Sequence, residues 1–166
     1  MGWMFWGLGA LALLYLLWRL VLLGRMPGLC RRHGQLVDFA TLVPSWKPNQ
    51  YLLAPPGTTT AQPQAEAPRY AVPPERLRDA LVRIIEAEPR SRILERSGDG
   101  LRFTLVQTTA LMAYPDFAAV EVRPAPGGST LLIYSRAVFG IRDFGVNGKR
   151  VQGWLGKLAD AAGKPV

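Results

Sequence analysis

Four polar residues near the C-terminus, Arg136, Asp143, Asn147 and Arg150, are of the types that bind anions or form buried ion pairs. We expect Arg136 to end a strand and Asp143 to lie at the turn into the last helix. A guanidinium can meet a carboxylate in a bidentate pair, and residues three apart on a helix are neighbours. The set could therefore form a polar pocket in which both arginines receive an anionic headgroup or carboxylate beside a helix N-terminus.

The same residues also fit a purely structural role. Asp143 or Asn147 would cap the last helix, Gly145 would supply an unusual backbone angle, and Arg136 would hold the strand-to-helix turn. We favour this interpretation because helix caps and buried pairs are more common than ligand sites. The four residues are thus candidate binding residues that could instead stabilise a corner of the fold.

A familiar catalytic set is not found in the sequence. His33 is the single histidine and Cys30 the single cysteine, so neither a Ser-His-Asp arrangement in the domain nor a closed Cys/His zinc site can be built. Asp116 and Asp143 could perform acid–base chemistry, but Asp116 also fits the turn that begins at Pro115. We predict no catalytic residues, no metal and no cofactor, and no phosphate-binding loop has the required spacing.

The hydrophobic pattern after residue 69 predicts a small α+β domain. A helix begins near Pro74, where proline and an acid occupy its first turn, and a second helix spans about 146–162. Their apolar stripes are Leu77, Leu81, Ile84 and Ile85, and Val151, Trp154, Leu155 and Leu158. Four strands are predicted between them, over residues 92–96, 101–111, 118–123 and 130–138. The order indicates a β-α-β4-α-like domain with a curved antiparallel sheet covered on one face by two helices.

An apolar run from Trp3 to Leu23 predicts a transmembrane helix, since about 20 residues span the bilayer core of about 30 Å. Arg19 could extend toward the headgroups, and Pro27 is expected to end the helix. A cleaved signal peptide is less favoured because the run is long and lacks a basic start and an A-x-A-like site. We therefore predict an anchor over residues 1–25.

Residues 26–68 are predicted to connect the anchor to the domain at 69–166. Residues 36–42 could form a short strand or a docked extended piece, and residues 46–57 contain prolines that prevent a helix. Residues 58–68 are rich in Thr, Gln, Ala and Pro, which is typical of an exposed, mobile linker.

The charge of the chain favours a membrane surface over nucleic acid. Twenty basic and 12 acidic residues give a formal charge of +8, but the arginines are scattered and not gathered on one element. Arg25, Arg31 and Arg32 follow the apolar run, and none precedes it, so the positive-inside rule places the domain in the cytoplasm. The opposite, extracytoplasmic topology stays open.

Residues 133–151 contain a motif that resembles the C-terminal signature of domain-of-unknown-function family 1499, approximately S-R-x-x-x-G-x-x-D-x-G-V-N-x-x-R-V. The matching residues are Ser135, Arg136, Gly140, Asp143, Gly145, Val146, Asn147, Arg150 and Val151. The Tyr114-Pro115-Asp116 stretch and residues 47–51 are also similar, so the resemblance covers about residues 47–160. Family members are commonly bacterial and often carry an N-terminal membrane or export segment, but the resemblance implies no activity.

These observations predict a non-catalytic, membrane-tethered binding or scaffold module that recognises a protein or an amphipathic, lipid-like ligand near the bilayer. The alternative is a membrane-associated enzyme of unfamiliar type that uses Asp143, Arg136 and Asn147. A carrier of hydrophobic ligands would require a cavity between the sheet and its helices. The oligomeric state does not follow from the sequence.

Overall fold

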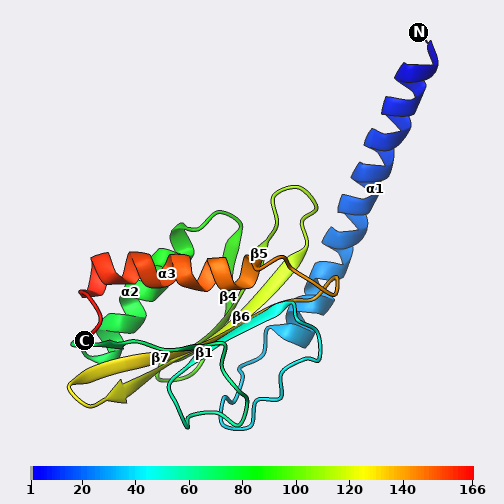
Figure 1. Cartoon of the computed structure of the whole chain (residues 1–166). Coiled ribbons are helices and arrows are strands. Elements are labelled where there is room, and N and C mark those ends of the chain that lie inside the picture. The colour runs from blue at the N-terminus through cyan, green and yellow to red at the C-terminus, as the bar shows by residue number, and fades with distance from the viewer. Residues whose placement is uncertain (1) are drawn as a thin grey trace.

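The computed structural model describes residues 2–166, and the side chains of residues 2–5 lie outside the described part. A long helix extends from one end of a sheet that carries two shorter helices (Figure 1). The elements are the helices α1 (Gly2–His33), α2 (Pro74–Ala87) and α3 (Val146–Ala162), and the strands β1 (Gln50–Ala54), β2 (Ala65–Glu66), β3 (Arg69–Tyr70), β4 (Ser91–Arg96), β5 (Arg102–Thr108), β6 (Pro115–Ala125) and β7 (Gly128–Ala137).

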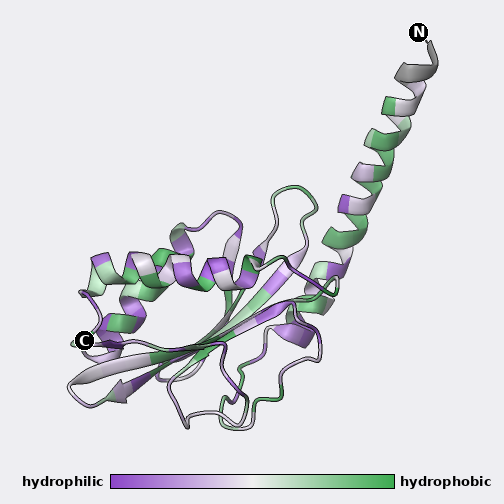
Figure 2. Ribbon diagram, viewed as in Figure 1, coloured by the Kyte–Doolittle hydropathy of each residue, from purple (hydrophilic) through white to green (hydrophobic). Residues whose placement is uncertain are grey.

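Helix α1 is apolar over most of its length, and its far half stands away from the domain (Figure 2). Its exposed large apolar side chains include Leu8, Leu11, Leu13, Leu14, Leu16, Leu17, Leu20, Val21 and Leu23. The helix is long and apolar enough to cross a membrane. A helix with these properties at the N-terminus suits an anchor, and a signal sequence has the same properties.

The sequence predicts that the helix ends at Pro27, but α1 continues to His33. An interior proline removes one hydrogen bond and costs about 3 kcal/mol. Contacts with the domain offset this cost, because Leu22 is buried before the proline and Arg92 Nη2 donates to Cys30 Sγ at 3.7 Å beyond it. Tertiary packing therefore extends α1 beyond its apolar run.

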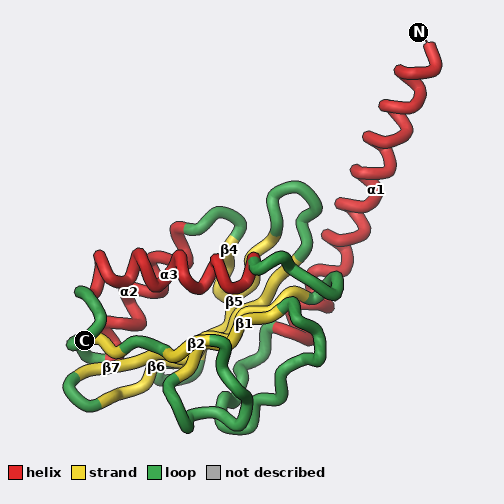
Figure 3. Tube along the Cα trace, viewed as in Figure 1, coloured by secondary structure: helices red, strands yellow, loops and turns green. Residues whose placement is uncertain are grey.

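The sheet has seven strands in the order β2-β1-β7-β6-β5-β4, with β3 also beside β7 (Figure 3). Strands β4 to β7 form an antiparallel meander, which confirms the four predicted strands. Only β1 and β2 pair in parallel among the described strands. The α+β class and the order of helix, four strands and helix are confirmed.

Strand β1 lies within residues 46–57, where the sequence predicts that prolines prevent a helix but does not predict a strand. Pro48 precedes the strand and Pro55 follows it, so neither removes a donor from the ladder. The strand pairs antiparallel with β7, with Leu53 opposite Ile133. The sheet thus includes a strand that lies before position 69 in the chain.

Helices α2 and α3 pack on the same face of the sheet (Figure 1). The helical side chains buried there are Leu77, Leu81, Ile85, Val151, Trp154 and Leu158, and those from the strands include Phe103, Leu105, Val120, Val122, Leu131 and Ile133. The predicted apolar stripes of α2 and α3 are confirmed. Ile84 and Leu155 are only partly buried and lie at the edges of these stripes. The space between sheet and helices is filled by these side chains.

The opposite face of the sheet is also covered, contrary to the prediction of one covered face. The covering segment is residues 34–61, and its cluster consists of Phe39, Leu42, Leu52, Ala54, Ala119, Leu132 and Tyr134. A strand buried on both faces has a continuous apolar run, and Leu131 to Tyr134 is such a run. Residues 36–42 form no strand and are docked on the sheet, which confirms one of the two alternatives for this segment.

Residues 58–68, expected to be an exposed linker, are held against β1. Gln64 explains how a polar segment can pack here: its backbone N–H donates to Leu52 O at 2.9 Å, and its side-chain oxygen accepts from Leu52 N at 2.6 Å. Gln64 therefore provides hydrogen-bond partners for the backbone N–H and C=O of Leu52 at the edge of β1. The composition of residues 58–68 alone predicts only contact with solvent.

Candidate functional site

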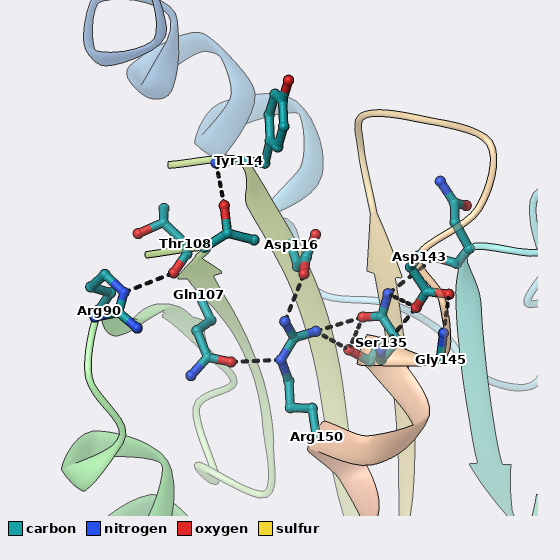
Figure 4. Close-up of polar contacts among 12 residues, drawn as sticks. Arg90, Gln107, Thr108, Tyr114, Asp116, Ser135, Asp143, Gly145 and Arg150 are labelled. Atoms are coloured by element: carbon teal, nitrogen blue, oxygen red, sulfur yellow. Dashed lines mark hydrogen bonds and ion pairs between the residues drawn. The ribbon is translucent and has the colours of Figure 1, made fainter. Parts of the chain in front are cut away.

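Arg150 is the centre of a buried polar network (Figure 4). Its guanidinium donates to Gln107 Oε1 at 2.6 Å, Ser135 Oγ at 3.1 Å, Asn147 Oδ1 at 2.6 Å and Asp116 Oδ2 at 2.6 Å. The side chains of Arg150 and Asp116 are only 9% and 6% exposed. Because every guanidinium nitrogen has a protein acceptor, Arg150 is fully engaged within the fold.

Three strand ends and one helix position this network. Gln107 lies near the end of β5, opposite Asp116 near the start of β6, and Ser135 lies near the end of β7. Arg150 comes from the second turn of α3, which crosses these strand ends (Figure 4). The network therefore fixes α3 to three neighbouring strands.

Asp143 and Asn147 form the corner between β7 and α3. Asp143 Oδ1 accepts from Gly145 N at 3.1 Å, and its Oδ2 accepts from Asn147 N and Nδ2, each at 2.8 Å. The helix begins at Val146, and Gly145 occupies the N-cap position with φ 78°. The sequence predicts Asp143 or Asn147 as the N-cap residue, and neither occupies that position. Asp143 lies two residues before the N-cap and accepts a hydrogen bond from the backbone N–H of Asn147 in the first turn.

Arg136 is not part of this cluster, and its predicted ion pair with Asp143 does not form. Successive residues of a strand point to opposite faces: Ser135 points toward α3, whereas the Arg136 guanidinium lies 5.7 Å from the Tyr134 ring centroid. Arg136 and Arg150 therefore cannot hold one anion together, and Asp143, Arg136 and Asn147 do not form one site.

The remaining motif residues have structural contacts. Ser135 donates to Asn147 Oδ1 at 2.6 Å, Pro115 begins β6, and Gly140 has φ 79°. The Gly140 carbonyl accepts from Asn49 Nδ2 at 3.0 Å. These contacts connect the loop after β7 to the segment that enters β1.

Burial raises the pKa of Asp116 above its usual value, although the hydrogen bond and charge of Arg150 oppose this effect and the Asp143 charge adds to it. Arg150 contacts only Oδ2, and no described residue donates to Oδ1. Asp116 also lines a pocket. One oxygen of a buried carboxylate is thus free to accept a hydrogen bond from a bound molecule.

The pocket beside Asp116, here called the anchor pocket, has a volume of about 440 Å³ and lies between α1 and two loops of the domain. Its lining residues are Trp18, Thr109, Tyr114, Asp116, Ala137, Phe139, Gly140, Arg142, Asp143, Phe144 and Val146. The Tyr114 ring centroid lies 5.6 Å from that of Trp18 and 5.4 Å from that of Phe139. The walls are aromatic, and the charged groups are two aspartates and one arginine.

A larger cavity, of about 650 Å³, lies elsewhere, near Pro68, Arg123 and Val166. It shares no lining residue with the Arg150 network or the anchor pocket. Its side chains include no buried carboxylate, so we place the candidate site at the anchor pocket.

Sequence reasoning did not identify Trp18, Gln107 or Asn49 as site residues. Gln107 and Asn49 carry no motif of their own, although residues 47–51 belong to the stretch that resembles the family. Trp18 belongs to the apolar run predicted to span the membrane, and its indole N–H donates to Met112 O at 3.3 Å. The only available signal for these residues was the family resemblance around Asn49.

Replacing Asp143 with alanine is expected to lower the free energy of unfolding by about 1 kcal/mol, because the first turn of α3 loses its cap. Although burial disfavours its charge, the hydrogen bonds from Asn147 and Gly145 lower the pKa of Asp143. Its contribution is therefore present above the unfolded pKa, near 3.8, and is lost as pH falls through the lower folded value. Urea denaturation of the full chain in micelles between pH 7 and 3 measures both effects.

The control for this variant is Asp160→Ala, at an exposed position of the same helix. It should change the stability by no more than about 0.5 kcal/mol. Equal losses in the two variants, or an unchanged acid dependence in Asp143→Ala, would show that Asp143 does not cap the helix.

Comparisons with known proteins agree with the resemblance of the C-terminal motif. The family described as "Protein of unknown function (DUF1499)" matches residues 44–158, which is more than half of the chain. No curated protein matches the sequence. A crystal structure of protein CV1439 from Chromobacterium violaceum is 15% identical, with a TM-score of 0.38, covering 70% of this chain and 98% of that one.

Proposed function

The chain belongs to the DUF1499 family, and we propose that it is a membrane-tethered binding module that takes an amphipathic, lipid-like molecule into the anchor pocket. Helix α1 would hold the domain at the bilayer. The pocket would receive the polar end of the ligand at Asp116 and its apolar part between the aromatic rings.

The observation that supports this proposal is the free Oδ1 of Asp116 in an aromatic-walled pocket. Ligand sites are typically apolar concavities with a few polar groups that fix orientation, and a volume of about 440 Å³ suits a small molecule. A carboxylate oxygen accepts hydrogen bonds and attracts positive charge. The polar end of the ligand is therefore a hydroxyl or an ammonium group, and aromatic rings also favour an ammonium group.

The position of the pocket supports a membrane source for the ligand. Trp18 belongs to the apolar run of α1 and forms one wall, so a lipid-like molecule in the bilayer would reach the pocket beside the anchor. The space between sheet and helices is filled by the core, which argues against a carrier that holds its ligand there. The enzyme alternative required Arg136, which lies on the other face of β7.

The test uses a photoreactive long-chain alkylamine, with a diazirine on its chain and a terminal ammonium group. The full chain in lipid nanodiscs is irradiated with this probe, and labelled peptides are mapped by mass spectrometry. We expect saturable labelling of peptides that contain residues 109–116 and 137–146. A long-chain carboxylic acid probe should label them less, because its charge repels Asp116.

The matched variants are Ala137→Phe, which fills the pocket, and Ala161→Phe, at an exposed position of α3. Ala137→Phe should weaken labelling by about fivefold or more, since overpacking costs about 1–3 kcal/mol. Ala161→Phe should leave it unchanged. Labelling that does not saturate, or that is equal in both variants, would contradict the proposed function.

A further inference from the structure

Two loops at the same end of the domain expose large apolar side chains. The loop of residues 109–114, between β5 and β6, carries Leu111, which is 71% exposed. The loop of residues 138–145, between β7 and α3, carries Ile141 and Phe144, and Phe144 is 89% exposed. We call Leu111, Ile141 and Phe144 the loop tips. Large apolar groups that gather at one surface mark a site of contact with another apolar surface.

The first loop lies beside the apolar run of α1. The Leu111 carbonyl accepts from Tyr15 Oη at 2.7 Å and from Arg19 Nη1 at 3.3 Å. The apolar run continues to Leu23, which lies four to eight residues farther along the helix. At about 1.5 Å per residue, Leu111 lies about 6–12 Å inside the end of the run.

The second loop lies at a similar depth. Phe144 and Trp18 line the same pocket, and Trp18 lies between the two α1 residues that bond to the first loop. The Phe139 ring, near the start of the second loop, packs on Tyr114 at the end of the first. Both loops therefore approach the same part of the anchor.

The backbone at each loop keeps an energetically unfavourable conformation. Ala113 has φ 55° and Phe144 has φ 53°, in the left-handed region that non-glycine residues seldom adopt. Such a conformation costs on the order of 1 kcal/mol and persists only where the surroundings hold it. In the second loop this conformation places an exposed aromatic residue next to the anchor.

We propose that the loop tips insert into the interfacial region of the bilayer, so that the domain is docked on the membrane as well as tethered to it. The exposed side chains of α1 include Leu16, Leu17 and Leu20, and the first loop contacts the same part of the helix at Tyr15 and Arg19. Arg19 and the exposed Arg142 lie at the same end, where their charges suit anionic headgroups. A lipid surface is therefore the partner that matches both the depth and the chemistry of this end.

This inference rests on the membrane anchoring in the proposed function, but it does not require a ligand in the anchor pocket. Docking would fix the orientation of the domain and keep the pocket open toward the bilayer. Inserted loops would also shield the rim of the pocket from water.

The test attaches the environment-sensitive fluorophore NBD to single cysteines in the full chain with Cys30→Ser. The labelled variants are Leu111→Cys and Phe144→Cys in the loops, Leu17→Cys as the reference for α1, and Gly98→Cys as the control. Gly98 is exposed at the turn between β4 and β5, at the opposite end of β5 from the first loop. Each variant is placed in nanodiscs with and without lipids that carry a nitroxide near the headgroup end of the acyl chain.

We expect both loop positions to show blue-shifted emission and quenching by the nitroxide lipids, as at Leu17, whereas Gly98 remains unquenched. Quenching at Leu17 without quenching at either loop would overturn docking and leave the anchor intact. A blue shift at the loops without quenching would indicate contact with a second copy of the chain and would also overturn it. Absence of quenching at all four positions would contradict both docking and anchoring, whereas failure of probe labelling in the anchor pocket alone would contradict only the proposed ligand.

Discussion

Replacing Arg150 with methionine is expected to lower the free energy of unfolding by about 3–5 kcal/mol, because breaking a buried ion pair leaves an uncompensated charge. Asp116 is 6% exposed and would lose its only charged partner at 2.6 Å. Gln107 Oε1 would also lose its donor. Urea denaturation of the full chain in micelles, followed by circular dichroism, measures the loss.

The loss should depend on pH in a direction that follows from the raised pKa of Asp116. Without Arg150 the folded pKa rises further, so the buried carboxylate is most destabilising above that value. Protonation relieves the cost as pH falls through the folded pKa. The difference between wild type and Arg150→Met should therefore be smaller at pH 5 than at pH 8.

Two further variants separate the buried pair from a general effect of losing an arginine. Arg136→Met, one residue along β7 from Ser135, should cost about 1 kcal/mol or less, because Arg136 loses only its contact with Tyr134. Adding Asp116→Leu to Arg150→Met should recover part of the loss, since the unpaired charge is removed. Equal losses at positions 136 and 150 would contradict the assignment of the network.

The contrast between these two arginines shows what the sequence could and could not predict about the site. The spacing of Asn147 and Arg150 depends only on helix geometry, and the structure places both on the network side of α3 as expected. The direction of Arg136 depends on which face of β7 each residue occupies. A shift of one residue reverses that choice, and polar residues at both 135 and 136 leave the sequence pattern ambiguous.

The fold shows the same division between local and long-range information. Helix α3 spans Val146–Ala162, as its apolar stripe predicts. Strand β1 was missed because its identity depends on pairing with β7, more than 75 residues away in the chain. The anchor pocket likewise brings together Trp18 and two loops that lie about 90 to 125 residues farther along, and no local pattern contains that information.

The covering segment, residues 34–61, determines how helix α1 and the domain are connected. A flexible connection would let the domain move freely about α1, whereas a packed segment holds it in place. Thr104 Oγ1 donates to the Gly34 carbonyl directly after α1, and Phe39 is buried five residues later. Helix α1 is thus connected to the sheet by packed structure, which is the geometry that a pocket shared between them requires.

Replacing Phe39 with alanine is expected to lower the free energy of unfolding by about 3–5 kcal/mol, the usual cost of removing a large aromatic side chain from a core. Phe39 is 1% exposed and packs against the face of the sheet opposite α2 and α3. Urea denaturation of the full chain in micelles again provides the measurement.

The matched control is Trp46→Ala in the same segment, where the indole is 79% exposed. It should change the stability by no more than about 0.5 kcal/mol, because it removes little buried area. If Phe39→Ala were as mild as Trp46→Ala, residues 34–61 would be a flexible connection and not a packed segment. The domain would then have no fixed position beside α1, and the anchor pocket, which depends on Trp18, would lose one of its walls.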